Sequence, residues 1–141
     1  MWNYIWPIAI VVLANTVYHL MAKSTPADVQ PFAALTVTYL TSSAVSFVLF
    51  LVTSPQKNFL TAVHKTNWTS IAFGISLVAL EFGYIYVYRS GWKVGIGSLV
   101  ANLCLAAVLL LIGVLFYKEH LSARQLIGVV LCIAGIILVN K

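Results

Sequence analysis

Long runs of apolar residues, separated by short polar stretches, divide the chain into five segments. Polar and apolar positions do not alternate within these runs, so a transmembrane β-barrel, whose strands need that alternation, is excluded. An α-helix needs about 20 mostly apolar residues to cross a bilayer, and it satisfies its own backbone polar groups there. The pattern therefore predicts an all-α membrane protein with five transmembrane helices, at about residues 2–21, 32–52, 68–88, 94–117 and 124–140.

Turn-forming residues mark the ends of these segments. Pro26 and Pro55 follow the first two segments closely, where a proline cannot continue a helix. Residues 59–63, between the second and third segments, are expected to form a short helix at the membrane interface. Before the last segment, Ser122 is followed three residues later by Gln125. This is the pattern of a capping box, which predicts that a new helix begins there.

The composition excludes a water-soluble domain. Of the 141 residues, 62% are hydrophobic and 8% are charged, whereas soluble domains contain about 25% charged residues. The net charge is +5, but the basic residues are scattered singly between apolar runs, so we expect no nucleic-acid partner. The N-terminal segment has no basic start and no convincing cleavage site, and we interpret it as the first membrane span. The lipid bilayer is thus the expected environment.

Lysine and arginine residues are divided equally between the two sides of the predicted membrane protein. Cytoplasmic loops normally carry the excess of these residues, which sets the orientation. With five spans, one side would hold Lys57, Lys65, Lys118 and Arg124, and the other Lys23, Arg89, Lys93 and Lys141. A chain without a preference can insert both ways, and two opposite copies reproduce the inverted-topology repeat of many transporters. We therefore expect an antiparallel homodimer; one fixed orientation set by weaker cues is the alternative.

Glu81 is a carboxylate near the middle of the third segment. At that depth a charged side chain costs on the order of 2.5–3.5 kcal/mol on insertion scales, and such residues commonly serve transport or proton transfer. A glutamate that only ties helices together is the alternative. Tyr84 lies near the same helix face, one turn further on, where its ring can meet a cation and its hydroxyl can hydrogen-bond the carboxylate. The two residues predict a cation or proton site.

Polar residues in three other segments are further candidates for the substrate or proton site. They are Asn15, Tyr18, His19, Ser42 and Asn102. For His19 the alternative is a histidine at the membrane interface, because it lies close to the end of its segment. For Ser42 the alternative is helix packing, because it belongs to a stripe of small hydroxyl residues along the second segment.

Gly128, Cys132 and Gly135 form a stripe of small residues along the fifth segment. Small residues let helices approach closely in lipid, and we assign this stripe to dimer packing. No metal-ligand spacing, nucleophile elbow or phosphate-binding loop occurs in the sequence. We therefore expect no enzymatic activity, no catalytic residue, no metal and no cofactor.

The C-terminal half resembles the second part of an EamA-type repeat of the drug/metabolite transporter superfamily. The ending KEHLSARQLIGVVLCIAGIIL carries most of the resemblance. It places a glutamate after the fourth span, a capping turn and a glycine-spaced final helix where the repeat has them, at Glu119, Leu121, Gln125, Gly128 and Gly135. The first span, ending HLMAKSTP, is similar to the opening of such repeats. The resemblance thus covers nearly the whole chain as one repeat.

The resemblance implies an architecture and a mode of action. Full-length members look like ten spans in two inverted five-span halves, and this chain, 1–141, would be a single five-span domain equal to one half. The resemblance therefore implies dimerisation, a central cavity between the copies and alternating access to it. The fourth span lacks the proline that such repeats often carry near its middle. Glu81 is no general signature of the repeat, so its role rests on its own chemistry.

Together these features predict a secondary transporter or exporter of small metabolites or organic cations in a bacterial cytoplasmic membrane. Glu81 would bind a proton or a cationic substrate group in an inverted homodimer. Two alternatives remain. The chain could be a flippase subunit for a lipid-linked substrate, with Arg89 and Lys93 holding a lipid phosphate, or a membrane assembly factor without transport activity.

Overall fold

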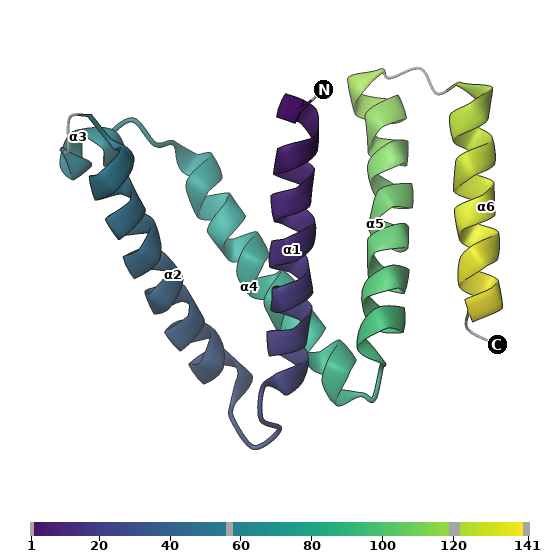
Figure 1. The fold of residues 1–141 in the computed structure, drawn as a ribbon, viewed down its shortest axis with the longest axis horizontal. Coiled ribbons are helices and arrows are strands. Elements are labelled where there is room, and N and C mark those ends of the chain that lie inside the picture. The colour runs from purple at the N-terminus through teal and green to yellow at the C-terminus, as the bar shows by residue number, and fades with distance from the viewer. Residues whose placement is uncertain (1, 56–57, 119–121, 140–141) are drawn as a thin grey trace. The chain divides into compact units, whose positions relative to one another are not determined.

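The computed structural model describes residues 2–55, 58–118 and 122–139. These residues form six α-helices and no strand (Figure 1), in agreement with the predicted all-α fold. The helices are α1 (Trp2–Ser24), α2 (Pro31–Thr53), α3 (Phe59–Val63), α4 (Trp68–Arg89), α5 (Val94–Tyr117) and α6 (Ala123–Val139). Four residues used in the sequence arguments lie outside the described ranges: Lys57, Glu119, Leu121 and Lys141.

Four helices have the length and apolar composition of membrane spans. They are α2, α4, α5 and the Ile5–Ser24 part of α1, and they coincide with the first four predicted segments to within a few residues. The fifth predicted segment corresponds to α6, of which the structure describes the 17 residues Ala123–Val139, whereas a stretch of 18 or more apolar residues indicates a spanning helix. The fifth span therefore stays a prediction, while the multi-pass membrane character is clear.

The predicted helix starts are confirmed by side-chain caps. At α6 the Ser122 backbone N–H donates to Gln125 Oε1 at 2.8 Å, and the Gln125 N–H donates back to Ser122 Oγ at 3.4 Å. This is the reciprocal pair of a capping box, which satisfies N–H groups that have no partner in the first helical turn. The short helix at residues 59–63 is also present as α3, with Asn58 Oδ1 accepting from the Thr61 N–H.

The first helix is longer than its predicted segment. It continues past Met21 to Ser24, although serine, threonine and proline in succession indicated a turn. The Ser24 hydroxyl donates to Leu20 O at 2.8 Å, and the Thr25 hydroxyl donates to Met21 O at 3.1 Å. Hydroxyl groups that bond back one turn in this way let polar residues remain helical. Lys23 is therefore part of α1 rather than of the loop.

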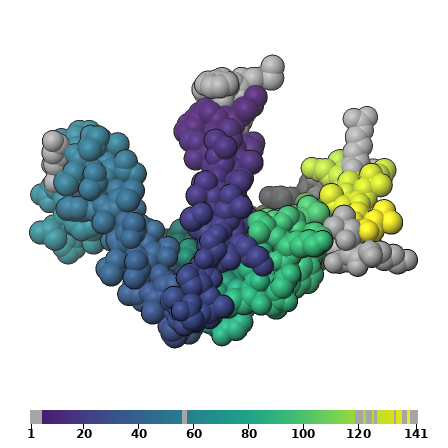
Figure 2. Space-filling view, turned by 60° about the horizontal axis from the view of Figure 1, so that its bottom comes forward, coloured from purple at the N-terminus to yellow at the C-terminus, as the bar shows by residue number. Residues whose placement is uncertain are grey.

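The helices α1 to α4 form one compact unit, and α5 and α6 form another. In the first unit both α1 and α2 pack against α4, and the core consists of Leu35, Ile85, Tyr88 and His19. The stacked rings of Phe32 and Phe82, 4.9 Å apart, join α2 to α4. From the 25–30 loop that connects them, α1 and α2 diverge, as the space-filling view shows (Figure 2). Their divergence leaves room for the cavity described below.

The second unit is a pair of adjacent helices, α5 and α6 (Figure 1). A groove of about 240 Å³ lies between them, lined mainly by aliphatic and small residues that include Ala106, Leu110, Gly128 and Cys132. A Cβ atom added at Gly128 or Gly135 would meet no described atom within 4 Å. The small residues of α6 are therefore not needed for close contact inside this chain. Their predicted role in dimer packing stays a prediction.

Candidate functional site

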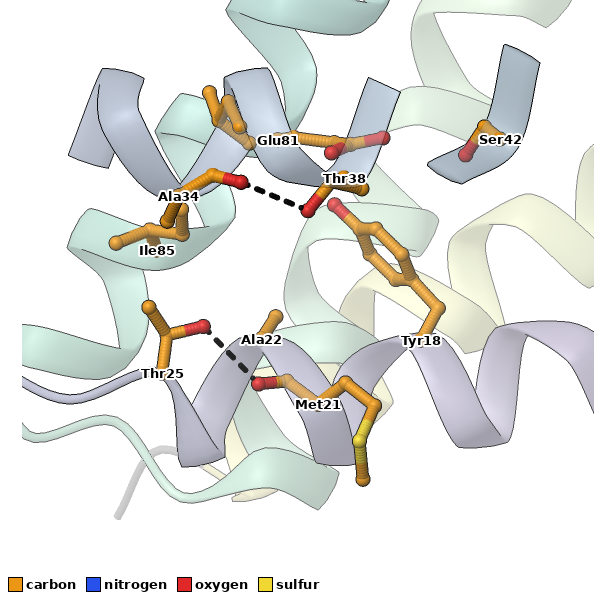
Figure 3. Close-up of a pocket in the computed structure, with 10 residues that line it drawn as sticks. Tyr18, Met21, Ala22, Thr25, Ala34, Thr38, Ser42, Glu81 and Ile85 are labelled. Atoms are coloured by element: carbon orange, nitrogen blue, oxygen red, sulfur yellow. Dashed lines mark hydrogen bonds between the residues drawn. The ribbon is translucent and has the colours of Figure 1, made fainter. Parts of the chain in front are cut away.

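A cavity of about 250 Å³ lies where α1, α2 and α4 meet (Figure 3). Its polar lining comes from all three helices or their ends: Tyr18, Thr25, Thr38, Ser42 and Glu81. Its apolar lining consists of Met21, Ala22, Ala34, Leu35 and Ile85. Ligand pockets in proteins typically measure 300–1,000 Å³ and combine an apolar wall with a few polar groups. The cavity has that composition and lies just below the usual size range.

Glu81 is the ionisable group of this cavity. Its side chain comes from α4, is partly buried, and extends toward Thr38 and Ser42 of α2 (Figure 3). The surrounding protein shields the carboxyl group from water, and the hydroxyl of Tyr39 interacts with it. The Thr38 hydroxyl donates to Ala34 O at 3.1 Å, one turn earlier in its own helix, so that proton is not directed at Glu81. The carboxyl group is therefore placed to meet a proton or a ligand.

Two phenol groups accompany Glu81. Tyr18 from α1 lines the cavity, and its hydroxyl points toward α2 beside Thr38 (Figure 3). Tyr39 from α2 lies close enough to Glu81 for the two groups to interact electrostatically. The hydroxyl oxygen of Tyr18 is buried and has no hydrogen-bond geometry to any group that the structure describes, whereas the Tyr39 hydroxyl interacts with the Glu81 carboxyl group. A buried polar group without a partner costs roughly 1–3 kcal/mol, which is unusual enough to need an explanation.

The three groups converge because they lie at similar depths from one end of the bundle. Glu81 precedes the end of α4 at Arg89 by eight residues, and Tyr39 follows the start of α2 at Pro31 by the same number. Each is therefore about 12 Å from that end, at a rise of about 1.5 Å per residue. Tyr18 precedes the end of α1 at Ser24 by six residues. The alternating direction of successive helices thus brings the carboxyl and both phenols to one level.

An aromatic cluster around His19 holds α1 against α4 next to the cavity. The buried imidazole, 7% exposed, shares a 2.9 Å hydrogen bond between Nδ1 and the Tyr88 hydroxyl. Its ring lies 4.8 Å from that of Tyr84, and the Tyr84 ring lies 5.7 Å from that of Tyr18. His19 and Tyr84 therefore support the wall of the cavity rather than line it.

Two basic residues fasten the α1–α2 connection to the end of α4. The Arg89 guanidinium donates from Nη2 to Pro26 O at 2.9 Å and to Val29 O at 2.7 Å. Lys23 Nζ donates to Tyr88 O at 3.2 Å. The two bonds of Arg89 engage one nitrogen, Nη2, of the side chain that the flippase alternative would use for a lipid phosphate.

The structure brings together some of the residues singled out in the sequence. Tyr18, Ser42 and Glu81 share the cavity, and His19 and Tyr84 adjoin it. Asn15 is exposed on α1 and is absent from the cavity lining, and Asn102 is exposed on α5 in the second unit. Tyr39 was missed, although it lies too deep in its segment to belong to an interfacial aromatic belt. Counting residues from Pro31 at the start of α2 and from Arg89 at the end of α4 would have indicated it.

Comparison with known proteins gives one match of nearly full length. The EamA-like transporter family matches residues 2–141, which include every residue of the cavity. No curated protein and no solved structure matches the chain significantly. The match supports the resemblance noted in the sequence. It identifies no substrate and no assembly.

Proposed function

Because the chain belongs to the EamA-like transporter family, we propose that it carries small metabolites or organic cations across a bacterial cytoplasmic membrane, coupled to proton movement through Glu81. The membrane character follows from four apolar helices of spanning length. Transport of the drug/metabolite type follows from the family. The role of Glu81, the coupling ion and the assembly are our proposal.

The observation that carries the proposal is the position of Glu81 in the lining of a cavity, where the structure shows no ion pair to it from any described residue. A carboxylate inside a span is costly, and the cost is usually offset by a partner or a function. Here the carboxyl group shares a cavity of about 250 Å³ with hydroxyl-bearing side chains. A carboxyl group can hold a proton or a cationic ligand but not both at once. Binding of a cation would therefore release the proton, which is the basis of coupled exchange.

The proposed working unit is a pair of chains with opposite orientation. One EamA-type repeat corresponds to half of the inverted structure, the lysine and arginine counts set no orientation, and α6 would serve as the fifth span. Many large apolar side chains among the described residues are exposed, among them Leu13, Leu40 and Leu111. Lipid covers part of this surface, and we assign the stripe at Gly128, Cys132 and Gly135 to the contact with the second copy.

Transport into proteoliposomes tests the proposal. The purified chain is reconstituted, a proton gradient is imposed, and uptake is measured across a panel of organic cations and small metabolites. Wild-type protein should accumulate at least one class of compound, and Glu81→Gln should abolish gradient-driven uptake because the amide cannot exchange a proton.

Asp28→Asn is the matched control, because it removes an exposed carboxylate from the α1–α2 loop. Its uptake should equal that of the wild type. Undiminished gradient-driven uptake by Glu81→Gln would remove this residue from the mechanism.

A further inference from the structure

His19 is a buried polar side chain that the transport proposal leaves without a role. It is 7% exposed, and its Nδ1 shares a 2.9 Å hydrogen bond with the Tyr88 hydroxyl, which joins α1 to α4. His19 precedes the end of α1 at Ser24 by five residues, about 8 Å at the rise of a helix. Tyr88 directly precedes the end of α4 at Arg89. The pair therefore lies close to the place where both spans end.

Aromatic rings and one ammonium group surround this pair. The ring centroids of Tyr18 and Tyr84 lie 5.1 and 4.8 Å from that of His19. Lys23, one turn further along α1, places its Nζ 3.2 Å from Tyr88 O and 6.0 Å from the centroid of the Tyr88 ring. The charged group in these contacts is thus a cation.

The other charged groups near this part of the first unit are directed away from His19. Glu81 extends toward α2 (Figure 3) and interacts there with Tyr39. Asp28 is exposed in the α1–α2 loop, and Arg89 donates to two carbonyl oxygens of that loop. Among the described residues, the hydrogen bond of the imidazole is therefore to a phenol and not to a carboxylate.

We propose that His19 is a pH-sensitive joint, which holds α1 on α4 while the imidazole is neutral and releases the end of α1 when it takes up a proton. A neutral imidazole has one N–H donor and one acceptor nitrogen, so either tautomer can bond the Tyr88 hydroxyl. An imidazolium ion has two donors, no acceptor and a positive charge. Burying such a charge without a paired anion is costly, and the ammonium group of Lys23 adds repulsion.

The aromatic surroundings do not offset this cost. A cation held over an aromatic face gains some attraction, but the penalty for taking an ion out of water is larger. The released end of α1 accepts a proton that the packed arrangement excludes, so acidification favours release. The contact is therefore complete above the ordinary pKa of histidine, about 6.5, and weakens as the pH falls below it.

Release of α1 also changes the cavity, because Tyr18, the neighbour of His19, belongs to its lining. The joint thus makes the shape of the cavity depend on the pH at the end of the bundle that carries the α1–α2 loop. This device is separate from the proton exchange proposed for Glu81 and does not rest on it.

Hydrogen–deuterium exchange of the full chain in lipid nanodiscs, read by mass spectrometry, tests the joint. The protection factor of residues 18–24 is compared at about pH 7.5 and about pH 5.5, with the intrinsic exchange rate at each pH taken into account. In the wild type it should fall about tenfold, because one pH unit below the ordinary histidine pKa of about 6.5 favours the protonated state by that factor. Residues 31–36 of α2, which contain no histidine, should keep their protection.

His19→Asn keeps a hydrogen-bonding group near the position of Nδ1 but takes up no proton in this pH range. Its protection at residues 18–24 should be equal at the two pH values. His19→Gln, an amide with a longer reach, replaces it if the asparagine variant does not fold. His64→Asn is the matched control, because His64 is exposed at the end of α3. It should show the same tenfold fall as the wild type.

The inference is overturned if the wild type is equally protected at both pH values, or if an amide variant loses as much protection as the wild type. An equal fall at residues 31–36 would indicate loosening of the whole protein and would overturn it as well. None of these results depends on uptake, so the proposed function stands or falls separately on the transport of Glu81→Gln.

Discussion

The cavity among α1, α2 and α4 and the groove between α5 and α6 are almost equal in volume, at about 250 and 240 Å³, but they differ in chemistry. The first contains a carboxylate, a phenol and several hydroxyls. The second is aliphatic apart from Cys132 and Gln125, and Gln125 is already engaged in the cap of α6. Polar groups inside a membrane are costly, whereas grooves with small residues suit helix packing. Lining rather than size therefore separates the proposed binding region from the proposed packing region.

The strongest test of this division is to overfill the packing region. Gly128→Leu adds a large side chain at a position where a Cβ meets no described atom within 4 Å. The chain should fold, but association of two copies should weaken by about 1–3 kcal/mol because overpacking costs that much. The measurement is the monomer–dimer equilibrium in detergent, followed by light scattering or fluorescence energy transfer.

Gly74→Leu is the control, because Gly74 on α4 is equally open and belongs to the first unit. It should leave dimerisation unchanged. Equal effects of the two substitutions, or no effect of Gly128→Leu, would contradict the assignment of packing to α6.

A comparable effect should distinguish the first unit, which is held partly by polar contacts. Tyr88→Phe removes the hydroxyl that shares a 2.9 Å hydrogen bond with the buried His19. The free energy of unfolding should fall by about 1–3 kcal/mol, because a buried imidazole nitrogen loses its partner. Unfolding in mixed micelles measures this. Tyr86→Phe, at an exposed position, should cost much less; equal costs would show that the His19 contact does not stabilise the unit.

The smallest expected effect concerns the start of α6. Ser122→Ala removes the hydroxyl that accepts from the Gln125 N–H, and loss of such a cap costs about 0.5–2 kcal/mol. The same unfolding measurement applies. Ser46→Ala is the control, because Ser46 lies inside α2 and far from its start. A Ser122→Ala protein as stable as the control would mean that the capping box does not support α6.

The positions of the helices were accessible from the sequence, because long apolar runs and local caps determine them. The Ser122–Gln125 box and the short helix at 59–63 depend on neighbouring residues, and both appear as predicted. The continuation of α1 as far as Ser24 was not predicted. Serine and threonine before a proline are typical of a turn, but here their hydroxyls donate to carbonyl oxygens of the preceding helical turn.

The candidate site could be predicted only in part from the sequence, because it depends on how helices distant in the sequence face each other. Hydropathy marked Glu81 and Tyr18 as unusual but could not tell that His19 would bond Tyr88 across α1 and α4. It also could not distinguish Asn15, which is exposed, from Tyr18, three residues later, which lines the cavity. Tyr39 was overlooked because a tyrosine in an apolar run resembles a packing residue until its level relative to Glu81 is known.

The most direct test of the central claim, exchange of a proton for a cation at Glu81, is proton release from the purified protein in weakly buffered solution. Addition of an organic cation that the wild-type protein takes up should acidify the solution with wild-type protein and with Asp28→Asn, because the bound cation displaces the carboxyl proton. With Glu81→Gln no proton should be released. Release from Glu81→Gln equal to that from the wild type would contradict the account.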